Sequence, residues 1–126
     1  MQISYFIKMK QGVKVNNNSI LNDKDKCGII GITGVTGKLG AYTAEMVAVN
    51  GQRAVHLARR PQKAKVYESA ELRRMTYTNS VETVDALTGI DTLLMVSARE
   101  NPNRVKEHKD FLDAAKSAGV KHIVYT

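Results

Sequence analysis

The glycine-rich stretch GIIGITGVTGKLG, residues 28–40, constrains the fold of this 126-residue chain more than any other feature. An isoleucine-rich run lies at its start and an amphipathic pattern follows it. We therefore expect a buried strand, a glycine turn and a helix. A glycine spacing of three residues allows two registers, Gly31-Gly34-Gly37 or Gly34-Gly37-Gly40. The choice between them decides where the strand ends and where a phosphate would bind.

The second register is the better physical solution. The first leaves only residues 27–30 for the strand and places two glycines inside the helix, each costing about 1 kcal/mol relative to alanine. The second extends the strand to residues 27–33, opens the helix near Gly37 and puts Gly40 on its first turn, where a missing side chain allows close packing. Gly31 then becomes a strand glycine, approached closely by the helix or a neighbouring backbone.

This register predicts a phosphate-binding site at the start of the helix. Gly34 permits the sharp turn out of the strand, and Gly37 leaves room for a pyrophosphate against the backbone. The N–H groups near Thr36, Gly37, Lys38 and Leu39 would face the phosphates, aided by the positive end of the helix. A glycine spacing alone is a weak signal, but a strand before it and a helix after it favour dinucleotide binding. A tight turn without a ligand is the alternative.

The second expected strand, residues 53–58, sets the choice of dinucleotide. An NAD-preferring site places Asp or Glu about 20 residues beyond the glycines. Here Arg59 and Arg60 occupy that place, with no acidic residue beside them. A guanidinium at Arg59 suits a 2′-phosphate by charge and by fork geometry, so we predict NADP(H) as the cofactor, with Lys38 and Lys63 as secondary candidates. The alternative is that both arginines are solvated surface charges.

Strand and helix patterns alternate along the rest of the chain. The further expected helices open at Pro61, run over residues 80–89, and run over residues 102–118. The further expected strands cover residues 72–77, 91–97 and 120–126. This alternation predicts an α/β fold with one domain over residues 27–126. We expect a Rossmann-like, doubly wound parallel sheet with the strand order 3-2-1-4-5.

Residues 1–26 differ from the rest. They are polar, with three consecutive asparagines, and we predict a flexible leader, although residues 3–9 could form a short strand. The formal charge of +7 could attract nucleic acid, but the basic residues are scattered and no nucleic-acid motif is present, so we expect no such partner. Without a long apolar run or clustered partners for Cys27, the sequence predicts no membrane span, no metal site and a cytoplasmic setting.

Several stretches resemble the NmrA-like atypical short-chain dehydrogenases, and within them the NADPH-dependent quinone oxidoreductases. They are ITGVTGKLG, LARRPQKA, LLMVSARE and HKDFLDAAKSAGVKHIVYT, together with Tyr77. The resemblance implies roles in holding the pyrophosphate for Gly34, Thr36, Gly37, Lys38 and Leu39. It also implies a role for Arg59 at the 2′-phosphate, for Tyr77 near the adenine, and for Val96, Ser97 and Ala98 beside the nicotinamide ribose. It departs at Thr76, where relatives often carry aspartate.

The resemblance further implies hydride transfer from NADPH to a quinone or a similar small carbonyl acceptor. Relatives are longer, which implies a fold truncated after strand 5, with no catalytic residue present and the substrate pocket missing. We expect a packing role for His108 rather than a cofactor-side role, and strand positions for His56 and Tyr125. The alternatives are a non-catalytic redox-sensing module, an inactive truncated product, or a basic protein whose glycine turn holds another phosphate ligand. An exposed strand 5 edge would favour self-association.

Overall fold

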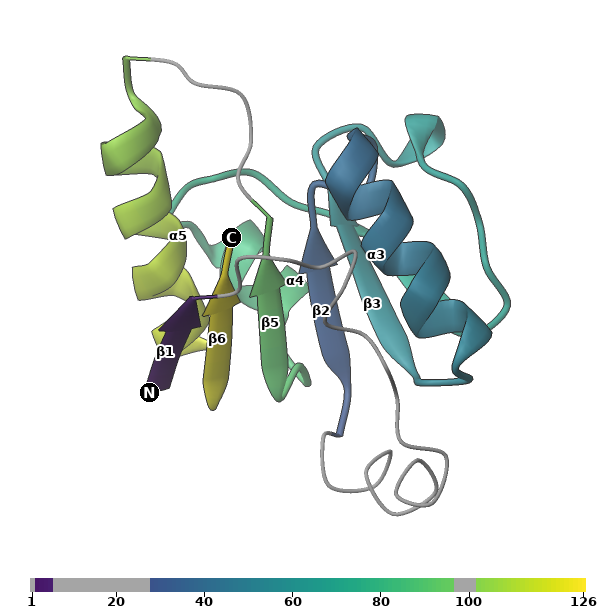
Figure 1. Cartoon of the computed structure of the whole chain (residues 1–126). Coiled ribbons are helices and arrows are strands. Elements are labelled where there is room, and N and C mark those ends of the chain that lie inside the picture. Colours follow the sequence, from purple (N-terminus) through teal and green to yellow (C-terminus); the bar gives the residue numbers. More distant parts are fainter. Residues whose placement is uncertain (1, 6–27, 97–101) are drawn as a thin grey trace.

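The computed structural model describes residues 2–5, 28–96 and 102–126 (Figure 1). Its strands form one six-stranded sheet in the order β1-β6-β5-β2-β3-β4, and every pairing is parallel. The strands are β1 (Gln2–Tyr5), β2 (Ile30–Thr33), β3 (Ala54–Ala58), β4 (Ala70–Arg74), β5 (Thr92–Met95) and β6 (His122–Tyr125). The helices are α3 (Lys38–Val49), α4 (Val81–Leu87) and α5 (Arg104–Ser117), with a 3₁₀ turn, η1, at Pro61–Lys63.

The order of β2 to β6 confirms the predicted Rossmann-like arrangement. Numbered from β2, these strands run 3-2-1-4-5 across the sheet. Ile30 pairs with Ala54 of β3 on one side and with Thr92 of β5 on the other, so β2 is central. Helix α3 covers one face, and α4 and α5 cover the other (Figure 1). The sheet is therefore doubly wound, and its order reverses between β2 and β5.

Strand β1 lies in the segment for which the sequence predicts a flexible leader. It pairs in parallel with β6, with Ile3 opposite Ile123. The open alternative of a short strand near residues 3–9 is thus realised over Gln2–Tyr5. The prediction that the fifth strand, β6, has an exposed edge is wrong, because β1 pairs along that edge. The rest of the predicted leader, and Cys27 after it, lie outside the described residues.

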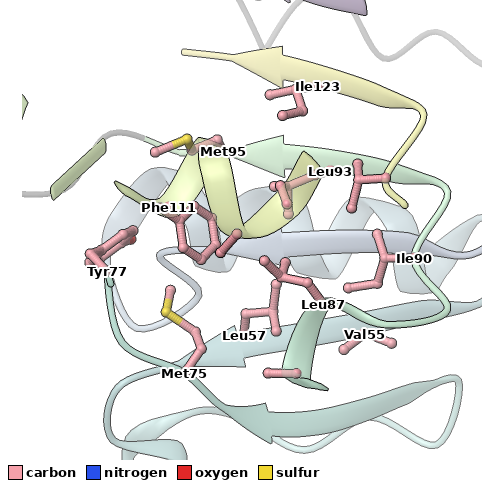
Figure 2. Packing of buried hydrophobic residues seen from close by; sticks show 14 residues of the cluster. Val55, Leu57, Met75, Tyr77, Leu87, Ile90, Leu93, Met95, Phe111 and Ile123 are labelled. Atoms are coloured by element: carbon pink, nitrogen blue, oxygen red, sulfur yellow. The ribbon is translucent and has the colours of Figure 1, made fainter. Parts of the chain in front are cut away.

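Two apolar clusters fill the two faces of the sheet. The larger one joins β3 and β5 to α4 and α5, and the side chains of Phe111, Leu87 and Leu93 are fully buried in it (Figure 2). The smaller one lies under α3 and centres on Ile32 and Ala44. Successive strand residues alternate between the clusters, as the period of two requires. This packing fixes the ends of β2, β3 and β5 relative to one another.

The segment after Pro61 differs from its prediction. Only the 3₁₀ turn Pro61–Lys63 forms, and Ala64 already has extended backbone angles. The chain then leads Tyr67 back against the sheet, where its ring meets His56 edge-on with centroids 5.6 Å apart. Packing of this partly buried ring against the smaller cluster outweighs the local helix preference, because most helical stability comes from tertiary packing. No helix among the described residues is long and apolar enough to cross a bilayer.

Candidate functional site

The glycine turn adopts the second of the two registers. Gly34 has a φ of +68°, which only glycine adopts without strain, and Gly37 is the N-cap of α3. A Cβ on Gly40 would lie 1.8 Å from the carbonyl oxygen of Gly34, so the helix can rest on the turn only without a side chain there. A Cβ on Gly31 would meet the side chain of Ile90 at 2.7 Å. The expected approach of a helix or a backbone to Gly31 is wrong.

The N-terminus of α3 is open to an anion. No side chain caps it, and its first turn contains no acidic residue. The N–H of Ala41 bonds the carbonyl of Gly37 at 2.9 Å, so the N–H groups of Lys38 and Leu39 before it have no partner within the helix. The N–H of Gly37 was also expected to face the phosphates, but it donates a hydrogen bond to the carbonyl of Gly34 at 3.0 Å. A phosphate therefore fits this end of the helix.

Gly37 contributes through its missing side chain. A Cβ there would meet only the carbonyl oxygen of Gly34 within 4 Å, at 3.5 Å, so the space beyond it is unfilled by the described protein atoms. Thr36, Gly37 and Lys38 are all exposed. The backbone of this turn can accordingly be approached from outside, as binding of a pyrophosphate requires.

Thr33 ties the ends of β2 and β5 together beside this turn. Its hydroxyl accepts the N–H of Val96 at 2.9 Å and donates to the carbonyl of Val96 at 3.3 Å. Both residues are buried. Val96 lies where the sequence predicts it, at the end of β5 next to the glycine turn, and Ser97 and Ala98 lie outside the described residues. The sequence analysis missed this role of Thr33. The available signal was a threonine at the end of a predicted buried strand, where the hydroxyl can bond backbone groups that have no partner in the sheet.

Arg59 leaves the same edge of the sheet. Thr33 of β2 pairs with Leu57 of β3, so the glycine turn and Arg59 follow neighbouring strands. The guanidinium carbon of Arg59 lies 5.9 Å from the ring centre of Tyr77. A cation over an aromatic face is favourable and restricts the orientation of the arginine. The structure therefore brings together the glycine turn and the arginine predicted from the sequence.

Tyr77 is a buried platform beneath Arg59. Its ring packs edge-on against Phe111 with centroids 5.1 Å apart, and the residue is only 8% exposed (Figure 2). Burial raises the pKa of the Tyr77 hydroxyl, while a hydrogen bond with Thr33 and the charge of Arg59 act in the opposite direction. Tyr77 thus packs between Phe111 of α5 and the guanidinium of Arg59.

A hollow of about 430 Å³ lies beside Arg59, between the end of β4 and the first turns of α5. It combines a cation, hydroxyl groups and carboxylates. Its lining residues are Arg59, Thr76, Tyr77, Thr78, Asn103, Lys106, Glu107 and Asp110. The sequence analysis points to Arg59, Thr76 and Tyr77 among these residues. The α5 residues were missed because nothing in the sequence shows which helix face meets β4.

Two histidines, His56 and His108, are buried in the packed interior. His108 is buried, and its Nδ1 shares a hydrogen bond with the hydroxyl of Tyr125 on β6. Burial and the charge of Arg104 lower the pKa of His108, while Glu107 opposes them. His56 lies inside β3, and its burial lowers its pKa. The expected packing of His108 and the strand positions of His56 and Tyr125 are confirmed.

A family model described as NAD(P)H-binding matches residues 34–126. The chain belongs to the NAD(P)H-binding family. Its matched part begins at Gly34, the first glycine of the turn, and runs through β6. Membership in this family confirms the prediction that the cofactor is a nicotinamide dinucleotide.

Relatives of this NAD(P)H-binding chain confirm the resemblance predicted from its motifs. Quinone oxidoreductase 2 of Escherichia coli K12 is 37% identical over 102 residues, covering 78% of this chain and 36% of that protein. The crystal structure of the NADPH-dependent quinone oxidoreductase from E. coli in complex with NADPH has a TM-score of 0.67 and 37% identity, over 76% of this chain and 35% of that one. The triphenylmethane reductase of Citrobacter sp. in complex with NADP(H) has a TM-score of 0.68 and 29% identity, over 76% and 36%.

The chain spans only about 36% of the length of the quinone oxidoreductase that it matches. The part matched by the family model contains the glycine turn, Arg59 and Tyr77, and runs through β6. The similarity therefore bears on the cofactor side of these proteins.

Proposed function

We propose that this chain is the NADP(H)-binding part of an oxidoreductase that delivers hydride to a quinone or a similar small carbonyl acceptor. One observation supports this most strongly: the uncapped N-terminus of α3 and the guanidinium of Arg59 lie at one edge of the sheet, with no acidic residue in the first turn of α3. A dinucleotide with a 2′-phosphate carries anions that suit both places. The crystal structures of the two relatives named above are complexes with NADPH and with NADP(H).

Each predicted residue takes a role in this proposal. The turn from Gly34 to Leu39 holds the pyrophosphate through backbone N–H groups, with Thr36 and Lys38 at its exposed rim. Arg59 binds the 2′-phosphate, and the adenosine occupies the hollow beside Tyr77. Val96, with Ser97 and Ala98 after it, runs beside the nicotinamide ribose at the switch between β2 and β5.

The chemistry comes from the cofactor. Bound NADPH supplies a hydride, and a quinone that accepts the hydride and one proton from water becomes a hydroquinone while NADP⁺ is released. The chain binds and orients the dinucleotide.

Titration of the purified chain with NADPH and NADH, followed by nicotinamide fluorescence, tests the binding proposal. We expect saturable binding of NADPH and weaker binding of NADH. Arg59→Leu should lower NADPH affinity by about 10-fold or more, because a charge-assisted bidentate contact is lost, and should change NADH affinity little. Arg60→Leu is the matched control, since Arg60 lies outside the hollow. Equal effects of the two substitutions on NADPH would contradict the role given to Arg59.

Addition of a quinone to the NADPH-loaded chain tests the reaction. Oxidation of NADPH that depends on both quinone and chain supports an oxidoreductase. Tight binding without turnover would instead favour a cofactor-binding module that lacks the acceptor site.

A further inference from the structure

The hollow beside Arg59 is lined by side chains of both charges. Arg59, which follows β3, contributes a cation, and α5 contributes the carboxylates of Glu107 and Asp110 together with the ammonium of Lys106. Thr76 and Thr78 follow β4 and supply hydroxyl groups to the lining. A ligand that fills this space should therefore carry an anion toward β3 and a hydrogen-bond donor toward α5.

The two carboxylates of the hollow differ in availability. Asp110 accepts a hydrogen bond from the ammonium of Lys106 at 2.8 Å, four residues earlier on the same helix. Glu107 has no side-chain partner in the parts of the chain that the structure describes. It lines the same hollow as Tyr77. Its negative charge adds to the rise in the pKa of Tyr77 and opposes the lowering of the pKa of His108. Glu107 is consequently the acceptor that a ligand in the hollow would meet.

The ligand of the proposed function has a matching shape. In adenosine 2′-phosphate, the phosphate and the base are attached to neighbouring carbons of one ribose. With the phosphate at Arg59, the base enters the hollow, and repulsion from Glu107 disfavours the opposite orientation. The edge of adenine carries an exocyclic amino group that donates hydrogen bonds. Hypoxanthine carries a carbonyl oxygen at the same position, which a carboxylate repels.

We propose, resting on the NADP(H) function above, that Glu107 recognises the 6-amino group of the purine base and so determines specificity for an adenine dinucleotide. The carboxylate accepts the hydrogen bond from the amino group, and the buried ring of Tyr77 forms part of the hollow wall. Glu107 thereby selects the base, while Arg59 selects the 2′-phosphate.

Comparison of NADPH with its deamino analogue, in which hypoxanthine replaces adenine, tests this proposal. The full chain is titrated with each and followed by nicotinamide fluorescence. We expect NADPH to bind about 10-fold more tightly, because a hydrogen bond to a charged acceptor is replaced by repulsion. Glu107→Gln should remove the preference, since an amide can donate to the hypoxanthine oxygen as well as accept from adenine. Asp113→Asn, on the same helix but outside the hollow, is the matched control and should keep it.

The outcomes separate the two proposals. Saturable binding of both dinucleotides with equal affinity overturns the role of Glu107 and leaves the NADP(H) proposal standing. Loss of the preference in Asp113→Asn to the same extent as in Glu107→Gln also overturns it, because a general charge effect would then be responsible. Failure of both dinucleotides to bind the folded chain overturns the cofactor proposal and the base recognition with it.

Discussion

The first turn of α3 rests directly on the glycine turn: a Cβ on Gly40 would lie 1.8 Å from the carbonyl oxygen of Gly34. This contact holds the open end of the helix against the end of β2. The fold therefore requires glycine at position 40. At position 37 the fold leaves space for a side chain, and only binding of the proposed ligand requires glycine there.

Substitutions at these two glycines should therefore have different effects. Gly40→Ala forces the helix away from the turn, and we expect a loss of about 1–3 kcal/mol in the free energy of unfolding, measured by urea denaturation. Gly37→Ala should cost only about 0.5 kcal/mol at the N-cap, yet weaken NADPH binding because the methyl group blocks the pyrophosphate. A stable Gly40→Ala chain would show that the helix can shift freely, contrary to the close packing described.

Thr33→Val should destabilise the end of the sheet. The buried N–H of Val96 loses its acceptor, and an unsatisfied buried donor costs about 1–3 kcal/mol. Thr43→Val is the matched control, because Thr43 is equally buried and its hydroxyl only adds a bond to the carbonyl of Leu39 at 2.8 Å. Denaturant unfolding of both variants compares them. Equal losses in stability would argue against a special role for the link between Thr33 and Val96.

The stability of the chain should fall in mild acid because of buried histidine. Burial lowers the pKa of His56, and burial with Arg104 lowers that of His108. In the unfolded chain both take up a proton near the ordinary pKa of about 6.5, while in the folded chain they do so only at lower pH. The unfolded state thus binds more protons below about pH 6.5, and the free energy of unfolding decreases as the pH falls through this window.

His56→Leu should make this decline shallower, because only the contribution of His108 remains. The Nε2 of His56 has no hydrogen-bond partner among the described residues, so the substitution removes a polar atom without orphaning another. His122→Gln is the control, since His122 is exposed at the start of β6. Thermal unfolding between pH 5 and 8 gives the profiles. An unchanged profile in His56→Leu would show that His56 does not contribute.

Removal of residues 1–5 should promote self-association. The deletion uncovers the edge of β6, whose backbone groups pair with β1 over Gln2–Tyr5. An unpaired strand edge is a template for another chain. Light scattering over a range of concentrations should show larger species for the shortened chain than for the full chain. The same distribution for both would mean that β1 does not protect this edge.

The local pattern of the sequence determined the central part of the fold. Alternating strand and helix patterns, the glycines at Gly34, Gly37 and Gly40, and Ser80 as an N-cap all act over a few residues. Their outcome follows from backbone freedom and hydrophobic period alone. The turn register and Arg59 at the end of β3 were accordingly predictable. The sheet order of β2 to β6 was predictable from the topology rules for alternating strands and helices that follow a glycine turn.

Only the tertiary structure decided the features that depend on contacts between distant segments. The pairing of β1 with β6 joins residues at opposite ends of the chain, and no local pattern encodes it. The same holds for the bond between Thr33 and Val96 and for the meeting of Glu107 with the residues after β4. The helix expected after Pro61 is likewise replaced by one 3₁₀ turn, beyond which the partly buried Tyr67 packs against the smaller cluster. Side chains brought together from separate elements form the walls of the site, and their contacts exist only once the sheet is assembled.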